Sequence, residues 1–145
     1  MKAFVIEAAN RPGELARVAE VIAGRGINIE AFSLGWGADG ALAFLSDDEI
    51  GLQSALDDAD GITYKEVPLL TIWLEDKPGT VAWAARKLAD VGANIEFFAP
   101  VDFTTDRKAT IAIGVDKIDA ARTALSDQLV EWKIPEKVYA GSVPR

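Results

Sequence analysis

The chain has 145 residues, of which 50% are hydrophobic and 26% charged, with a net charge of −8. It contains no cysteine and no histidine, which excludes disulfides, thiolate or imidazole catalysis, and thiolate or imidazole metal ligands. It lacks the clustered basic residues that phosphate backbones require, a secretory signal, and any apolar run of the roughly 20 residues that a membrane helix needs. We therefore expect a cytoplasmic protein without a cofactor or metal, which binds neither nucleic acid nor membrane.

The first predicted elements are a strand and a helix. Residues 3–8 are a short run rich in strand formers, with Phe4 and Ile6 on its covered face. A helix is predicted from Pro12, because proline fits the first helical turn, and a left-handed C-cap is predicted at Gly26. The apolar positions at helical spacing are Leu15, Val18, Val21 and Ile22.

Four further elements are predicted before residue 68. A second strand starts at Asn28, and Asp39-Gly40 marks a hairpin into a third strand. The carboxylates at 47–49 suit the start of a second helix that runs to about Ala59. Residues 62–67 complete the set as a fourth strand.

The same order of elements then recurs, because residues 76–98 repeat residues 10–32. Without gaps, 10 of the 23 aligned positions are identical between NRPGELARVAEVIAGRGINIEAF and DKPGTVAWAARKLADVGANIEFF. A repeat of this length is a whole domain rather than a solenoid unit. We assign residues 1–67 to one domain and residues 68–145 to a second, with Pro68 as the break between their strands.

The second copy is predicted by the same rules. Its first strand places Leu70 and Ile72 on the helix-covered face, and Val81, Ala85 and Leu88 follow at helical spacing after Pro78. The remaining expected features are a C-cap at Gly92, a strand from Asn94, a hairpin at 105–107, a helix capped by Asp116 that runs to about Leu125, a strand within 129–139 and a tail at 140–145. The predicted class is α+β, with two tandem ferredoxin-like βαββαβ units whose antiparallel sheets carry helices on one face.

The Pro-Gly before each first helix and the Gly-x-Asn-Ile after it, repeated at constant spacing, resemble the ACT domain. This resemblance spans about residues 3–67 and 69–135. It implies a regulatory protein that binds a small ligand, most often an amino acid, where the loop before the first helix of one unit faces the second-strand start of a neighbouring unit. The implied ligand-binding residues are Asn10, Arg11, Pro12, Gly13, Asn28, Ile29, Asp76, Lys77, Pro78, Gly79, Asn94 and Ile95. Asn10 stands where the family usually has Asp, so the two sites need not be equivalent.

Elementary chemistry supports such a site. A helix N-terminus presents unpaired N–H groups and partial positive charge that can receive a carboxylate, and Gly13 and Gly79 would not block its approach. Each feature also has a purely structural interpretation. The Pro-Gly pairs shape a turn, and Asn28 and Asn94 tie down a tight connection.

Two other functions use the same topology. An acylphosphatase-like hydrolase would need a glycine-rich anion cradle around an arginine, and RNA binding would need exposed aromatics in basic surroundings. Neither pattern is present in the sequence. A pure protein–protein interaction module is the remaining alternative. We expect a non-catalytic sensor, as a homodimer or with a regulated protein partner.

Three tryptophans depart from the repeat. Trp73 and Trp83 occupy the solvent-facing slots of Glu7 and Arg17, which predicts either a homodimer contact or packing between the copies. Trp36 lies between Gly35 and Gly37, a pattern that predicts a bulge with the indole packed on the sheet, or else an indole exposed towards a ligand.

Overall fold

The computed structural model describes residues 1–134, so the expected tail at 140–145 lies outside the described residues. The first half contains β1 (Lys2–Ala9), α1 (Glu14–Ala23), β2 (Glu30–Trp36), β3 (Asp39–Leu45) and α2 (Glu49–Asp57). β4 (Lys65–Glu75) leads into the second half, which contains α3 (Thr80–Asp90), β5 (Ile95–Phe103), β6 (Lys108–Val115) and α4 (Ile118–Ala124), followed by a 3-10 turn at Ser126–Gln128. In the part of the chain described, no helix is long and apolar enough to span a membrane.

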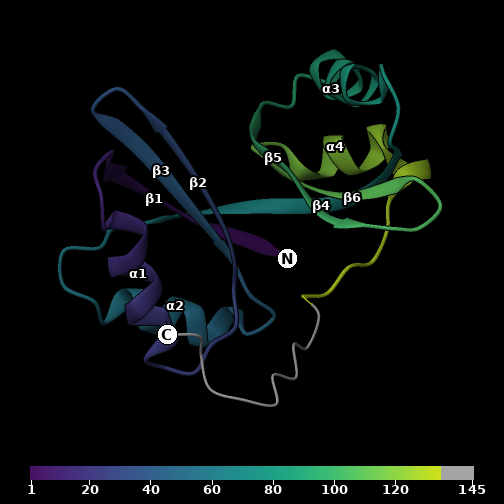
Figure 1. The fold of residues 1–145 in the computed structure, drawn as a ribbon. Helices are drawn as coiled ribbons and strands as arrows, with labels where there is room; N and C mark the ends of the chain where they lie inside the picture. The colour runs from purple at the N-terminus through teal and green to yellow at the C-terminus, as the bar shows by residue number, and fades with distance from the viewer. Residues whose placement is uncertain (135–145) are drawn as a thin grey trace.

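The strands form one antiparallel sheet in the order β2-β3-β1-β4-β6-β5 (Figure 1). Within the first half, the order β2-β3-β1-β4 is that of a ferredoxin-like unit. The α+β class predicted from the sequence is confirmed.

The break expected at Pro68 is wrong, because β4 runs through it as one 11-residue strand. The pairing partner changes there instead. Pro68 is the last β4 residue paired with β1, opposite Lys2, and Leu69 is the first paired with β6, opposite Gly114. A proline is tolerated at this point because β4 exchanges one neighbour for another around it. One strand therefore serves as the last strand of the first half and the first strand of the second.

The fourth strand expected in the second half is reduced to a single bridge between Ile72 and Leu129. One residue further on, the Val130 N–H donates to the Thr71 carbonyl (3.0 Å), and the Thr71 hydroxyl donates to the Val130 carbonyl (2.5 Å). The chain then continues to Ile134, whose N–H donates to Asp47 of the first half (3.2 Å). Residues 135–139 of the predicted strand lie outside the described residues.

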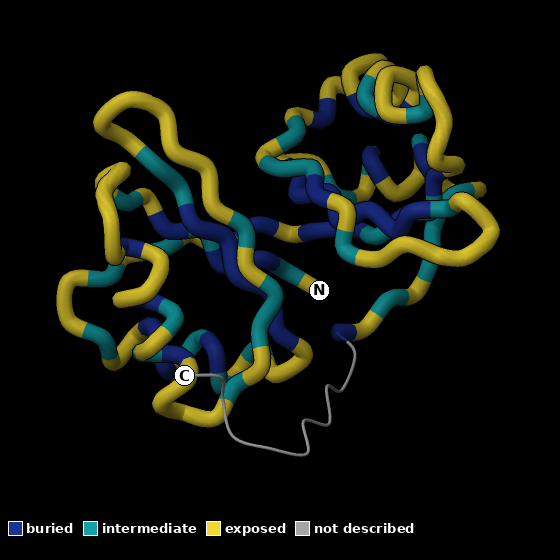
Figure 2. Tube along the Cα trace, in the orientation of Figure 1, coloured by how far each residue is buried: buried dark blue, intermediate teal, exposed yellow. Residues whose placement is uncertain are grey.

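The buried side chains form three hydrophobic cores, of which only the third joins the halves, and Figure 2 shows the buried chain concentrated along the strands. In the first half, α1 and α2 pack on the sheet face that carries Phe4 and Ile6, as predicted. In the second half, α3 and α4 pack on the face that carries Leu70 and Ile72, also as predicted. The third core lies on the faces opposite the helices, and its buried members are Ala3, Leu45, Leu69, Ala112 and Ile134.

A register shift between Ile95 and Phe97 makes the two halves differ. The sequence repeat aligns Phe32 with Phe98, yet Phe98 packs on the helix-side core of the second half. Phe97 instead enters the third core and stacks on Phe32, with ring centroids 6.4 Å apart. An extra residue in a strand moves every later side chain of that strand to the opposite face of the sheet. Phe32 and Phe98, which the repeat aligns, therefore point to opposite faces.

Candidate functional site

The two loops before the first helices have nearly the same backbone. α1 and α3 begin at Glu14 and Thr80, two residues later than the predicted starts at Pro12 and Pro78. Their N-caps are Gly13 (φ 89°) and Gly79 (φ 93°), both left-handed and both without a side-chain cap. A non-glycine residue would be strained at these positions, which explains why proline precedes the helix rather than opening it. Gly26 and Gly92, predicted as left-handed C-caps, are left-handed (φ of 70° and 68°), but the helices end earlier, with C-caps at Gly24 and Val91.

Both N-caps are open on the outside. A Cβ built on Gly13 or on Gly79 would meet no atom within 4 Å. Among the described residues, no side chain caps either helix, and no neighbouring atom fills the space beside either glycine. Each helix presents its positive dipole end to solvent or to a ligand.

The first loop is tied to the β2–β3 hairpin by Asn10. Its backbone N–H donates to the Ala38 carbonyl (3.0 Å), and its side-chain amide donates to the Gly37 carbonyl (2.9 Å). The same amide fills the space that a Cβ on Gly35 would need, at 2.3 Å from it. Asn10 thus has a structural role, which accounts for the glycine at position 35.

Charged side chains beside the first loop pair with one another. Buried Glu14 accepts from Arg11 (2.7 Å) and Arg17 (3.2 Å). Hydrogen bonds from these two arginines lower the pKa of the Glu14 carboxyl, against the opposing effect of burial. Arg11, a predicted ligand contact in the loop, is therefore paired with Glu14, the first residue of the helix that follows.

The second loop uses different side chains. Thr80, which replaces Glu14, donates to the carbonyls of Glu75 (2.9 Å) and Lys77 (3.1 Å). Lys77 pairs with Glu75 (2.7 Å) and lowers the pKa of that carboxyl. The Asp76 backbone N–H donates to the carbonyl of Arg107, whose φ is +60°. The Asp76 side chain is exposed and makes no hydrogen bond or ion pair with any other residue in the described range 1–134.

The second-strand starts are held through their backbones. The Ser46 hydroxyl donates to the Asn28 carbonyl (2.8 Å), and the Asn94 N–H donates to the Asp116 carboxylate (2.8 Å). Asp116 therefore fixes Asn94 rather than capping α4, whose N-cap is Lys117. Asn28 and Asn94 are exposed, while Ile29 and Ile95 pack partly against the two helix-side cores. β2 and β5 begin at Glu30 and Ile95, one or two residues after the predicted starts.

The structure does not bring each loop to the strand start of its own half. Asn10 is bonded to the β2–β3 hairpin, whereas Asn28 is bonded to Ser46 at the opposite end of the seven-residue strand β3. At about 3.4 Å per residue this is a separation of roughly 20 Å. The second half repeats the arrangement along β6, from Arg107 at one end to Asp116 at the other.

Nor does one half complete the site of the other. The 10–13 loop follows the last residue of β1 and the 76–79 loop follows the last residue of β4, and these strands are antiparallel. The two loops therefore lie at opposite ends of the molecule (Figure 1). A site that combines a loop with a strand start requires a second molecule.

Two apolar side chains beside the open N-caps were assigned to the core by their helical spacing and are not in it. Leu15 on α1 is 39% exposed and Val81 on α3 is 54% exposed. They occupy equivalent positions of the repeat, in the first turn after the left-handed glycine. The only sequence signal that could have identified Leu15 and Val81 as site residues is that both copies of the repeat have an apolar residue at this position.

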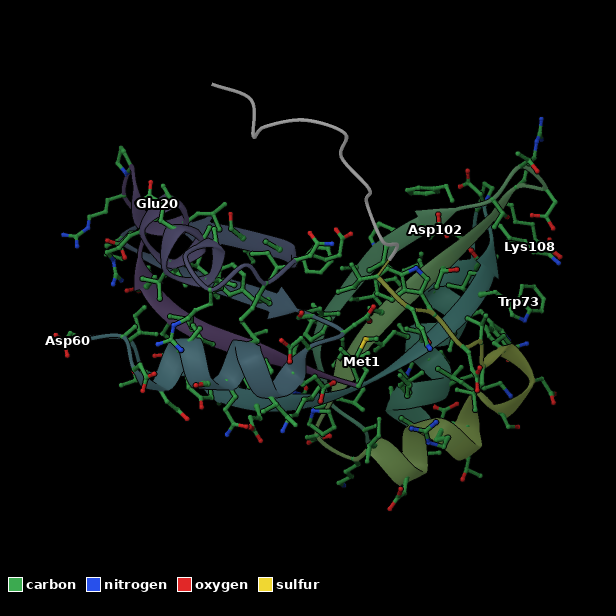
Figure 3. The ribbon with its side chains drawn as sticks, turned by 90° about the horizontal axis from the view of Figure 1, so that it is seen from below. Met1, Glu20, Asp60, Trp73, Asp102 and Lys108 are labelled. Atoms are coloured by element: carbon green, nitrogen blue, oxygen red, sulfur yellow. The ribbon has the colours of Figure 1, made fainter. Side chains whose placement is uncertain are left out.

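The three tryptophans that depart from the repeat fall outside the core between the halves, unlike Trp132, which packs against it. Trp36 is 85% exposed and the β2–β3 pairing has no register shift, so the predicted bulge with a packed indole is wrong. Trp73 contacts Lys108, whose ammonium lies 4.8 Å from the ring centroid (Figure 3). Trp83, 40% exposed, lies near Lys87 in the same way (5.7 Å). Neither Trp73 nor Trp83 belongs to the third core, so the packing between copies that was considered for them is not observed.

A groove of about 1120 Å³ lies where the end of the described chain passes between the halves. Its charged lining is mixed, with Asp47, Glu49 and Glu131 against Arg122 and Lys133. Among residues 1–134, no group of three or more acidic side chains is arranged to hold a metal ion. The predicted ligand loops lie outside this groove.

Comparison with known proteins identifies the fold. No family model and no curated protein matches the chain. Protein BT0572 from Bacteroides thetaiotaomicron superposes with a TM-score of 0.70 and 23% identity, over 89% of this chain and 90% of that one. The regulatory subunit of aspartate kinase from Thermus flavus gives 0.60 and 22%, over 87% and 91%, and that from Thermus thermophilus gives 0.58 and 21%, over 88% and 90%. These likenesses support the ACT-domain fold that the sequence resembles.

Proposed function

We propose that the chain is a non-catalytic regulatory protein that binds a small ligand, an amino acid in the first instance, at the N-terminal ends of α1 and α3. The observation that carries this proposal is the pair of uncovered helix N-termini behind Gly13 and Gly79. Free N–H groups at the positive end of a helix dipole are suited to an α-carboxylate. The fold shared with regulatory subunits of aspartate kinase supports the same function.

The surroundings of each N-terminus suit the rest of an amino acid. The exposed carboxylate of Asp76 can receive an α-ammonium group beside α3. Leu15 and Val81 provide apolar surface in the first turn of each helix. Asn28 and Asn94 offer amide donors and acceptors that a second molecule would bring to the loops.

The ligand would act by stabilising one assembly of the protein, because no single molecule brings a loop to a strand start. A ligand that binds only the assembled form shifts the population towards it. The two domains of the repeat, 1–67 and 68–145, would each supply one loop and one strand start.

A thermal-shift screen against the twenty amino acids at millimolar concentration tests the proposal. An amino acid present at 100 times its dissociation constant adds about 2.7 kcal/mol, which raises Tm by roughly 5–10 °C for a chain of this size. The variants Gly13→Ala and Gly79→Ala place a methyl group where the ligand would approach. Gly61→Ala is the matched control, because Gly61 also has a positive φ (72°) with no atom near its Cβ, but belongs to the connection between α2 and β4 and to neither loop.

We expect at least one loop variant to lose the shift while Gly61→Ala keeps it. A screen without any shift would contradict amino-acid binding. Equal shifts in all three glycine variants would contradict the site.

A further inference from the structure

The groove between the halves exists because two segments meet end to end along one edge of β4. The Leu69 N–H donates to the Met1 carbonyl (3.1 Å), and a short distance along the same edge the Val130 N–H donates to the Thr71 carbonyl (3.0 Å). The chain after Val130 therefore cannot continue along β4, because the next position is already occupied. Residues 131–134 leave the sheet, and they line the groove of about 1120 Å³ together with residues of both halves.

Both halves contribute apolar side chains to this groove. Met1, from the first half, lies in the middle of the molecule (Figure 3). Leu69, Leu70 and Ile134 are buried, and Leu129 is partly buried against the core of the second half. The volume exceeds the roughly 300–1,000 Å³ of ordinary small-molecule sites. The groove thus has the room and the apolar surface that the body of an organic molecule needs.

The carboxylates that the first half places in the groove already have donors. Asp47 accepts from the Ile134 N–H (3.2 Å), and Glu49 accepts from the Lys2 N–H (3.0 Å). Of the three carboxylates in the lining, only that of Glu131 has neither a hydrogen bond nor an ion pair with another residue in the range 1–134. Most of the acceptor capacity of the charged lining is therefore used by the protein itself.

The donors of the groove, by contrast, lack acceptors. Arg122 and Lys133 are exposed, and neither forms a hydrogen bond or an ion pair with any residue between positions 1 and 134. The indole N–H of Trp132 is buried and has no hydrogen-bond partner. A buried donor without an acceptor is unfavourable, and a ligand that supplies an acceptor removes this cost. Two cations and one indole N–H in the same lining thus call for acceptor oxygens.

We infer that the groove binds an organic anion, a carboxylate or a phosphate monoester, that carries an apolar body. The anionic oxygens accept charge-assisted hydrogen bonds from Arg122 and Lys133, and the body covers the apolar lining. Because the Trp132 N–H has no exposed surface, an oxygen reaches it only when residues 131–133 move slightly to admit the ligand. An anion held by both halves stabilises their packing against each other.

This site is separate from the proposed sites at the N-terminal ends of α1 and α3. No residue of the 10–13 loop or the 76–79 loop lines the groove. The groove also lies within one molecule, so its ligand needs no second copy of the chain. The protein would therefore respond to two kinds of ligand at two places.

Calorimetric titration with three octyl compounds at millimolar concentration tests the need for an anion. Octanoate and octyl phosphate carry the two headgroups on the same apolar chain, whereas 1-octanol is uncharged. We expect saturable binding of at least one of the two anions at one site per chain, and at least about tenfold weaker binding of 1-octanol. The anion that binds identifies the headgroup. If neither anion binds, or if 1-octanol binds equally well, the inference is overturned.

Two double variants locate the site. Arg122→Gln/Lys133→Gln should weaken binding of the anion by at least about tenfold. Arg86→Gln/Lys117→Gln is the matched control, because it removes the same charge from exposed positions outside the groove, and it should bind like the wild type. Equal losses in both double variants would show an effect of net charge alone and would contradict the site.

Two single variants examine the segment that borders the groove. Trp132→Phe keeps an aromatic ring but removes the N–H, and should weaken binding several-fold. Glu131→Gln removes the one carboxylate without a donor, and should strengthen binding because it no longer repels the anion. Melting curves without ligand show whether each variant is folded. Unchanged affinity in both folded variants would contradict the assigned lining. A protein that keeps an amino-acid shift but binds neither octyl anion would overturn this inference and leave the proposed function standing.

Discussion

At the residue scale, the left-handed glycines decide where α1 and α3 begin. Gly13 and Gly79 have φ near 90°, a conformation that L side chains rarely adopt, and each is followed at once by the first helical residue. The proline before each glycine therefore lies in the loop that leads to the helix, and not in the first turn of the helix. The recurrence of Pro-Gly in both copies thus has a backbone cause that is independent of any ligand.

A second residue-scale feature is the carboxylate of Glu14, which two arginines hold in a buried position. Its pKa is lowered in the folded chain, so the folded state favours the ionised form. Its contribution to stability is complete above the unfolded pKa of about 4.3 and is lost as the pH falls through the lower folded pKa.

We therefore predict that Glu14→Gln lowers Tm at neutral pH, and that its difference from wild type shrinks in acid. Melting curves from about pH 7 to about pH 3 measure this difference, which should stay constant until the carboxyl begins to protonate. Glu20→Gln, at an exposed position without an ion pair to any residue in the range 1–134, is the control and should change little at any pH. A Glu14→Gln deficit that is independent of pH would contradict the role of the ion pairs.

At the element scale, the register shift in β5 decides which phenylalanine reaches the core between the halves. Phe97 lies so close to Gly114 of β6 that a Cβ on this glycine would be 2.3 Å from the ring. The same Cβ would be 2.9 Å from a methyl group of Val67 on β4. Gly114 therefore provides the space in which the ring stacks on Phe32.

We predict that Gly114→Ala destabilises the fold by about 1–3 kcal/mol, because a methyl group cannot be added there without moving the ring or β4. Urea denaturation measures this cost. Gly24→Ala is the matched control, since its Cβ contacts are ordinary (3.4 Å and 3.5 Å) and its φ is −60°, and it should be neutral or stabilising by about 0.5 kcal/mol. Equal effects of the two substitutions would contradict the packing of Phe97.

At the scale of the whole molecule, β4 joins the two repeats more closely than a linker would. Its first residues complete the β1 edge of the first half, and the rest form the strand between β6 and Leu129. The third core and the bond from Ile134 to Asp47 add contacts between the halves. Neither half has a complete sheet without β4.

We predict that the chain unfolds in one cooperative transition and that neither 1–67 nor 68–145 folds alone. Calorimetry of the full chain should give equal calorimetric and van't Hoff enthalpies. Circular dichroism of the separate fragments should show no cooperative melting. Two resolved transitions, or a fragment with its own melting curve, would indicate independent domains despite the shared strand.

Much of this architecture follows from the sequence alone. Proline and glycine at fixed offsets, carboxylates at a helix start and periodic apolar residues predict the elements, because these signals act within a few residues of the chain. The repeat predicts that the elements recur, and the burial of Phe4, Ile6, Leu70 and Ile72 confirms the faces.

Only the tertiary structure decided what depends on neighbours distant in sequence. The continuity of β4 through Pro68, the exchange of Phe98 for Phe97, and the exposure of Leu15 and Trp36 are examples. A periodic pattern shows that a side chain belongs to a face, but the partner that covers this face comes from another part of the fold or from another molecule. The local chemistry of the ligand loops was therefore readable from the sequence, whereas their placement at opposite ends of the molecule was not, because it depends on how the two repeats share a strand.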